Sequence, residues 1–186
     1  MPIIAELTEK AKRTRMIMMD VDGVLTDGRI LYSAEGVEIE AFHVRDGVGL
    51  HAAQRAGLVT AILTGRSSMA VARRAKELGI SEIHQGVADK VGTYETLLRR
   101  YNLTDEAVAY IGDDLNDLPL LARAGLSAAP ADAAEEVRAT VAYLAQRGGG
   151  RGAVREIIEL ILRAQGRWEQ VIEESRGVLP EDEAFS

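Results

Sequence analysis

The 186-residue chain carries 29 acidic and 22 basic side chains, a formal net charge of −7, and no cysteine. The acidic balance argues against a surface that binds nucleic-acid phosphates, and the lack of cysteine excludes disulfides, thiolate nucleophiles and cysteine-ligated zinc. No apolar run reaches the roughly 20 residues of a membrane span, and residues 1–15 lack the apolar core of a secretory signal, so we expect a cytoplasmic protein with no membrane partner.

Taken in order, the chain predicts strands that alternate with helices. A short amphipathic helix or arm leads into Met16–Met19, an apolar run typical of a buried parallel strand. Further strands are expected over 58–63, 81–87, 107–112 and 125–129, and helices over 45–56, 67–78, 90–101, 118–124, 133–139 and 153–172. This alternation predicts one α/β domain over 1–172, built on a doubly wound parallel sheet, with 173–186 as a flexible acidic tail.

Residues 29–44 interrupt the first strand-to-helix connection. Apolar and polar side chains alternate there on both sides of Glu35-Gly36, the pattern of a β-hairpin. An isolated hairpin is marginally stable in water. We therefore expect this one to form a flap beside the site and to pack on a neighbouring subunit.

Polar residues stand where several predicted elements begin or end. Asp20 and Asp22 follow the first strand, Thr64 the second, Lys90 opens a helix, and Asp113 begins an acidic cluster after the fourth strand. Each has an ordinary explanation alone: a turn or helix cap, a solvated lysine, or carboxylates at a helix dipole. The carboxyl ends of parallel strands meet at one sheet edge, which favours a shared site.

These residue types suit phosphoryl transfer through an aspartyl-phosphate. One carboxylate would attack phosphorus, and a second would act as general acid and then as general base. A hard cation such as Mg²⁺ prefers carboxylate oxygens, while a hydroxyl and an ammonium stabilise the phosphate oxygens.

At this point the chain resembles the haloacid dehalogenase superfamily of phosphohydrolases, over roughly residues 14–165. The resemblance rests on DVDGVLTDG (20–28), LTGR (63–66), Lys90 and GDDLND (112–117), in that order. It implies a Rossmann-like core, a Mg²⁺ cofactor and hydrolysis of a phosphate ester.

The resemblance also implies a role for each matching residue. Asp20 is the implied nucleophile and Asp22 the acid/base, and both would ligate the metal, Asp22 through its backbone carbonyl. Thr64 and Lys90 would bind the transferred phosphate and assist catalysis, and Asp113 would supply a metal carboxylate.

Two further acidic residues of the last motif have less defined roles. Asp117 would be oriented near the metal carboxylate. Asp114 would serve either the water shell of the metal or only the helix cap.

Other segments narrow the resemblance to the 3-deoxy-D-manno-octulosonate 8-phosphate phosphatases. They are the hairpin, FHVRDGVGL (42–50), RRAKELGI (73–80) and GGRGAVRE (149–156). Such enzymes have no large cap domain and form homotetramers whose hairpins build a central barrel, with neighbours completing each site. The implied reaction is hydrolysis of a small eight-carbon sugar-acid phosphate in lipopolysaccharide biosynthesis.

The substrate carboxylate needs cationic partners. Besides Thr64, Gly65 and Lys90 on the phosphate, we consider Arg66, Arg45, Arg74 and Arg151 as substrate ligands. Arg66 is favoured because it lies beside Thr64, whereas Arg74 is equally consistent with a solvated helix position. His43 and His51 are expected to pack or hydrogen-bond, and Trp168 to anchor the last helix.

Alternatives remain within and outside the enzyme class. A phosphatase for nine-carbon sialic-type acids differs only in a few pocket contacts. A phosphorylation-switch receiver domain carries similar groups, but in it the acidic pair and acceptor Asp precede the Thr and Lys; here Thr64 and Lys90 precede a second acidic cluster. A purely structural oligomerisation module would leave the matched polar groups unexplained.

Overall fold

The computed structural model describes residues 2–177, and its main feature is a six-stranded, all-parallel sheet. The strand order is β5-β4-β1-β6-β7-β8. These strands are β1 (Met16–Met19), β4 (Val59–Leu63), β5 (Glu82–His84), β6 (Val108–Ile111), β7 (Leu126–Ala129) and β8 (Tyr143–Leu144). The helices are α1 (Pro2–Arg13), α2 (Val44–Arg55), α3 (Met69–Glu77), α4 (Lys90–Tyr101), α5 (Leu118–Leu121), α6 (Glu135–Arg138), α7 (Ala153–Ala164) and α8 (Trp168–Gly177), with 3-10 turns η1 (Asp105–Ala107) and η2 (Leu115–Asp117).

The chain reverses its direction of growth at β1. It first adds β4 and β5 on one side of β1 and then β6, β7 and β8 on the other. The register pairs Met19 with Ile62 of β4 and with Ile111 of β6. In such sheets ligands bind where the strand order reverses, outside the carboxyl ends of the strands. The residues that follow Met19 and Ile111 therefore lie at the expected site.

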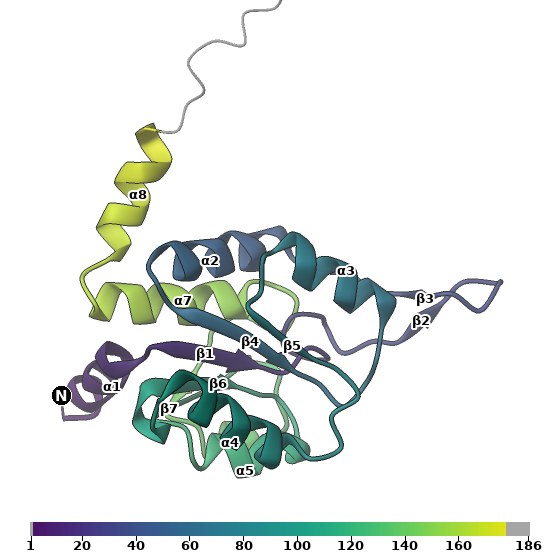
Figure 1. Cartoon of the computed structure of the whole chain (residues 1–186), viewed down its shortest axis with the longest axis horizontal. Helices are drawn as coiled ribbons and strands as arrows, with labels where there is room; N and C mark the ends of the chain where they lie inside the picture. Colours follow the sequence, from purple (N-terminus) through teal and green to yellow (C-terminus); the bar gives the residue numbers. More distant parts are fainter. Residues whose placement is uncertain (1, 178–186) are drawn as a thin grey trace, which may run out of the picture.

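Strand β1 contributes to both layers of the core. Ile17 and Met19 belong to a cluster with α1, α2, α3 and α7, whereas Met16 and Met18 belong to a second cluster with α4, α5 and α6. Helices α2, α3 and α7 lie on one face of the sheet and α4 and α5 on the other (Figure 1). Since all four side chains are fully buried, an uninterrupted apolar run is what this position requires.

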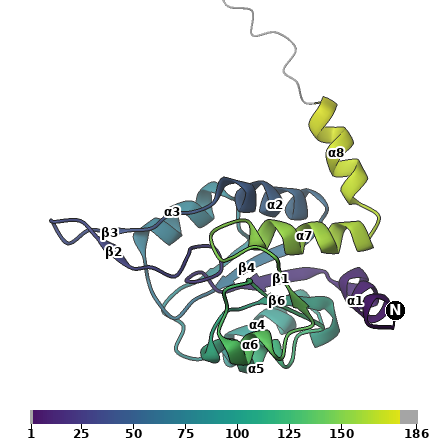
Figure 2. The same cartoon turned by 180° about the vertical axis from the view of Figure 1, so that it is seen from behind.

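The predicted hairpin is present but short. Strands β2 (Leu31–Tyr32) and β3 (Glu38–Ile39) pair antiparallel around a turn in which Gly36 has φ +77°. The hairpin projects from the body beyond α3 (Figures 1 and 2). Its apolar side chains are exposed: Ile30, Leu31, Tyr32, Val37 and Ile39. No large cap domain interrupts the described residues, as predicted.

Two features of the C-terminal region differ from the sequence prediction. A sixth strand, β8, was not predicted, because two residues are too short for a periodic signal. The single helix expected over 153–172 is two helices, α7 and α8, which separate at Gly166 in the left-handed region (φ +69°). Residues 173–177 of the predicted tail belong to α8, and its remainder lies outside the described residues.

Within the described residues, no helix has the length and apolar character that crossing a membrane requires. Trp168 is buried at the start of α8, with Arg155 and Arg163 of α7 over its ring at 4.7 and 5.6 Å from the centroid. It anchors the last helix, as expected.

Candidate active site

Asp20 is a buried carboxylate directly after β1. Its side chain accepts a hydrogen bond from the Val21 backbone N–H at Oδ1 (2.7 Å) and from Lys90 Nζ at Oδ2 (2.6 Å). Burial and the neighbouring Asp117 carboxylate raise the pKa of Asp20, and the Lys90 ammonium opposes both effects. The lysine is thus the principal group favouring the charged form.

Lys90 bridges two carboxylates, Asp20 directly after β1 and Asp117 in η2. It is the first residue of α4, and its Nζ lies 2.6 Å from Asp20 Oδ2 and 2.8 Å from Asp117 Oδ1. It is only 8% exposed, so the ordinary explanation of a solvated lysine does not hold. Burial lowers the pKa of Lys90, but the two carboxylates outweigh it and the net change is upward, which keeps the ammonium charged.

Asp117 is fully buried, and both of its oxygens have partners. Oδ1 accepts from Lys90 and from the Tyr110 hydroxyl (2.7 Å), and Oδ2 accepts from the Asp113 backbone N–H (3.0 Å). The sequence had placed Asp117 only near the metal carboxylate. In the structure it holds Lys90 and the Asp113 backbone in place, which makes it a positioning residue.

Tyr110 was missed by sequence reasoning. It lies within the apolar run of β6, and the sequence pattern there indicates only a core side chain. The residue is indeed fully buried. Only the fold shows that its hydroxyl reaches Asp117.

Asp113 follows β6 and is partly buried beside Asp20. Burial first, then the Asp117, Asp20 and Asp114 carboxylates, raise its pKa to about 7. The missing side chain of Gly23 makes room for Asp113, because a Cβ there would overlap Asp113 Oδ2. A cation bound next to Asp113 would stabilise the charged form of this carboxylate.

A group of carboxylates suited to a metal ion lies at this sheet edge. Among the described residues, Asp20, Asp113 and Asp117 each offer an oxygen within 4.8 Å of the others. Asp20 and Asp117 each accept hydrogen bonds on both oxygens, but of the three carboxylates only Asp20 and Asp113 line the cavity described below, so these two are the ones that a metal ion in the cavity could reach. The Asp22 side chain is outside this group, and its Oδ1 lies 3.6 Å from Arg66 Nη1. This position is compatible with the expectation that Asp22 ligates a metal through its backbone carbonyl. Oxygen donors of this kind fit Mg²⁺.

Asp114 is exposed and accepts a hydrogen bond from the Leu115 backbone N–H (2.8 Å) as the N-cap of η2. The helix-cap explanation suits this residue.

A cavity of about 490 Å³ opens over these groups. Its lining residues come from the ends of β1, β4 and β6: Asp20, Asp22, Gly28, Thr64, Gly65, Arg66, Asp113, Asp114, Leu115 and Asn116. Thr64 is 2% exposed and does not cap α3, whose N-cap is Ser68. The structure therefore brings Asp20, Asp22, Thr64 and Arg66 to one cavity, with Lys90 behind Asp20.

Three predicted substrate arginines lie outside this cavity. Arg45 lines a separate one beside Arg147 and Arg155. Arg74 packs against α2, where a Cβ on Gly47 would lie 2.7 Å from its Nη2. Arg151 is 3.7 Å from Asp27 Oδ2 in the loop that follows β1. We call this loop, residues 20–28, the catalytic loop because it lies at the candidate active site. None of the three lines the cavity wall.

His43 caps α2 by accepting a hydrogen bond from the Arg45 backbone N–H (3.2 Å), a structural role as expected.

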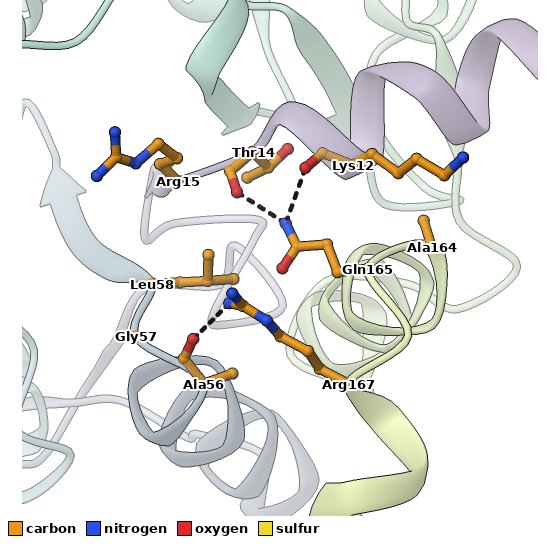
Figure 3. A pocket seen from close by; sticks show the side chains of 9 residues that line it. All are labelled: Lys12, Thr14, Arg15, Ala56, Gly57, Leu58, Ala164, Gln165 and Arg167. Atoms are coloured by element: carbon orange, nitrogen blue, oxygen red, sulfur yellow. Dashed lines mark hydrogen bonds between the residues drawn. The ribbon is translucent and has the colours of Figure 1, made fainter.

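A larger hollow, about 600 Å³, lies at the opposite end of β1 and β4 (Figure 3). Its polar groups serve the ends of helices: Gln165 Nε2 donates to the Thr14 carbonyl (2.7 Å) and Arg167 to the Ala56 carbonyl (2.6 Å). It is lined by no acidic side chain. None of the predicted site residues lines this hollow, so we do not assign the active site to it despite its larger volume.

A doubly wound sheet with a lysine-bridged carboxylate cluster at its switch point fits a haloacid dehalogenase-like hydrolase, and the family model of that description matches residues 75–148. The 3-deoxy-D-manno-octulosonate 8-phosphate phosphatase of Escherichia coli strain K12 is 41% identical over 169 residues, 91% of this chain and 90% of that protein. The chain belongs to this family of phosphatases.

Solved structures agree. The 3-deoxy-D-manno-octulosonate 8-phosphate phosphatase of Moraxella catarrhalis, crystallised with a magnesium ion, a phosphate ion and a KDO molecule, is 45% identical with a TM-score of 0.90, covering 92% of this chain and 99% of that one. The cobalt-bound enzyme of Haemophilus influenzae is 40% identical with a TM-score of 0.85, covering 91% and 99%.

Proposed function

We propose that this chain hydrolyses 3-deoxy-D-manno-octulosonate 8-phosphate to the free sugar acid and phosphate, with Mg²⁺ and through an aspartyl-phosphate on Asp20. The observation that carries the proposal is the Asp20 carboxylate, held by Lys90 in the wall of a cavity that also contains Asp22. Relatives of that name, one crystallised with magnesium, phosphate and KDO, support the choice of substrate. The reaction would serve lipopolysaccharide biosynthesis.

In the first step, an Asp20 oxygen attacks phosphorus and the bond from phosphorus to the sugar oxygen breaks. The departing oxygen takes its proton from Asp22, the general acid. Lys90 and the Val21 N–H hold the Asp20 carboxylate by separate oxygens, which limits its rotation. A nucleophile that is already oriented loses less conformational entropy on reaching the transition state, which lowers the activation free energy.

In the second step, the Asp22 carboxylate accepts a proton from a water molecule that attacks the acyl-phosphate. Phosphate is released and Asp20 returns to its carboxylate form, while Asp22 regains its proton. The Asp22 side chain is 29% exposed, so it has access to both substrate and water.

The phosphate oxygens would be bound by the Thr64 hydroxyl, the Gly65 backbone N–H and Lys90. Asp20, Asp113 and the Asp22 backbone carbonyl would hold Mg²⁺, which supplies positive charge against the phosphate when bound. The carboxylate cluster and the raised pKa of Asp113 support this assignment.

Arg66 is the proposed partner of the substrate carboxylate. It lines the same cavity, and its planar guanidinium suits bidentate binding of a carboxylate.

We also propose a homotetramer formed through the hairpins, in the cytoplasm. The exposed apolar side chains of β2 and β3 support the first point, because a lone hairpin gains stability by burying them. A multiply charged sugar phosphate does not cross a membrane by itself. Its hydrolase is therefore expected in the compartment where the substrate is made.

Phosphate release with Mg²⁺ tests the proposal. Strong preference for the eight-carbon substrate over a nine-carbon sugar-acid phosphate and an aryl phosphate is the expected result. Equal slow release from all three would leave phosphatase chemistry but remove the substrate assignment.

The nucleophile is tested by Asp20→Asn. This variant should lose at least about 1,000-fold in kcat, since covalent catalysis is lost, while keeping its fold. Glu136→Gln removes the same charge from an exposed site on α6 and should retain full activity. Robust turnover by Asp20→Asn would refute the assignment of Asp20 as the nucleophile.

A further inference from the structure

The Arg66 guanidinium contacts carboxylates from two distant segments. Its Nη2 donates to Glu38 Oε1 on the hairpin (2.8 Å), and its Nη1 lies 3.6 Å from Asp22 Oδ1 on the catalytic loop. Glu38 is in β3, so the ion pair joins the hairpin to the loop after β4. The side chains of Arg66 and Glu38 are 35% and 24% exposed.

We infer that Glu38 is a positioning residue that holds the Arg66 guanidinium in the orientation that receives the substrate carboxylate. The inference rests on the proposed function, in which Arg66 binds that carboxylate. It adds a specificity-determining residue that the motifs at the strand ends do not include.

The geometry of a guanidinium explains the effect. Its donors form a rigid planar fork, so the hydrogen bond from Nη2 to Glu38 restricts the directions in which the other donors can point. With Glu38 in place, Nη2 has its own acceptor, and Nη1 is turned toward the cavity and Asp22. Without Glu38, the nearest carboxylate to Arg66 is Asp22. Arg66 would then divide its time between free rotamers and the proposed acid/base.

A partly exposed ion pair contributes little to stability. The contribution of Glu38 is therefore expected in substrate binding, because ordering a long side chain beforehand removes that entropy cost from the binding step.

Glu38 is the hairpin residue placed for this role. Glu40, two residues on, is partly buried and interacts with Ser68 and Glu38; burial, together with the Glu38 and Asp22 carboxylates, raises its pKa, and its buried Oε2 has no hydrogen-bond partner. Glu35 lies at the exposed turn of the same hairpin, where its side chain interacts with Ser33. Only Glu38 of these three forms the ion pair with Arg66.

Glu38→Gln is the test, because it keeps the shape and removes the charge. We expect KM for 3-deoxy-D-manno-octulosonate 8-phosphate to rise about tenfold. Its kcat should change less than about twofold, as should both constants for an aryl phosphate, which has no carboxylate for Arg66. Glu35→Gln removes the same charge from the same hairpin and should behave as wild type. Glu38→Asp keeps the charge on a shorter arm and should give an intermediate KM.

Hydrogen exchange supplies a readout that needs no substrate. In the ligand-free protein, loss of the tether should speed exchange of the backbone amides over 31–39 in Glu38→Gln and not in Glu35→Gln.

The outcomes separate this inference from the proposed function. If the wild type does not prefer the eight-carbon substrate, the substrate assignment fails, and the exchange result still reports the tether. An unchanged or lower KM for Glu38→Gln would overturn the inference, a lower KM meaning that Glu38 competes with the substrate for Arg66. An equal rise of KM for the aryl phosphate would also overturn it, since a general disturbance of the site would then be the cause.

Discussion

The carboxylate of Asp113 fills the space that a side chain at Gly23 would need. A Cβ on Gly23 would overlap Asp113 Oδ2, and a Cβ on Gly149 would in turn overlap the Gly23 carbonyl oxygen. The Gly149 N–H also donates to Asp132 (2.8 Å). The glycine-rich loop before α7 therefore supports the catalytic loop, which in turn leaves room for the carboxylate next to Asp20.

Gly23→Ala should disable the site. The added methyl group would displace Asp113, and φ of +78° at residue 23 strains any side chain. We expect at least a 100-fold loss of kcat and a higher Mg²⁺ requirement, with a cost of about 1–3 kcal/mol in the free energy of unfolding. Steady-state kinetics over a Mg²⁺ titration and urea unfolding measure both.

Gly57→Ala is the matched control for backbone strain. Gly57 has φ +82°, and a Cβ there would meet no atom within 4 Å. It should cost about 1–2 kcal/mol in stability and leave kcat and the Mg²⁺ requirement unchanged. Equal loss of activity in both variants would mean that strain, and not the contact with Asp113, disables the site.

Tyr110→Phe removes the hydroxyl that donates to Asp117 Oδ1. The buried carboxylate would lose one partner, at a cost of about 1–3 kcal/mol, and its hold on Lys90 would loosen, lowering kcat several-fold. Tyr143→Phe is the matched control, since its hydroxyl donates to Glu156 (2.9 Å) away from the site. That variant should lose stability alone. A wild-type kcat in Tyr110→Phe would show that Asp117 positions Lys90 without this hydrogen bond.

Asp113→Asn separates metal binding from folding. Mg²⁺ should raise the melting temperature of the wild type, because a ligand that binds only the folded state stabilises it, and should leave that of Asp113→Asn nearly unchanged. Without metal at pH 8, the variant should melt higher than wild type, because the pKa of Asp113, raised to about 7, makes its charged form unfavourable. Differential scanning fluorimetry measures these melting temperatures. If Mg²⁺ stabilised both proteins equally, Asp113 would not be a metal ligand.

Asp46, which is outside the carboxylate cluster of the proposed metal site, should make the stability of the protein depend on pH. It is 2% exposed and accepts from the Gly152 and Arg155 backbone N–H groups (3.1 and 2.8 Å), and burial raises its pKa despite these bonds. The folded state then binds a proton more tightly than the unfolded chain, so the contribution of Asp46 to stability is present at low pH and falls as pH rises from about 4 through the raised pKa.

Asp46→Asn removes this dependence. The unfolding free energy of the variant minus that of wild type should therefore increase with pH over the same interval, whatever the constant cost of the lost hydrogen bond. Urea titrations at a series of pH values measure this difference. A difference that is flat, or that decreases with pH, would contradict the raised pKa.

The doubly wound sheet and the main groups of the site follow from the amino-acid pattern alone. Met16–Met19 had to be a strand buried on both faces, because an uninterrupted apolar run is stable only between two layers of helices. The residues directly after such strands must meet at one edge. Asp20, Thr64 and Asp113 could therefore be placed together from their positions along the chain alone.

The contacts that hold these groups in place emerge only in the folded chain. The Tyr110 hydroxyl on Asp117, the Gly149 support under Gly23, and the Glu38 partner of Arg66 join segments far apart in the chain. Local periodicity reports which face of an element is buried, but it carries no information on which side chain of another element will be opposite. That choice follows from packing, in which each contact depends on the shape of all its neighbours.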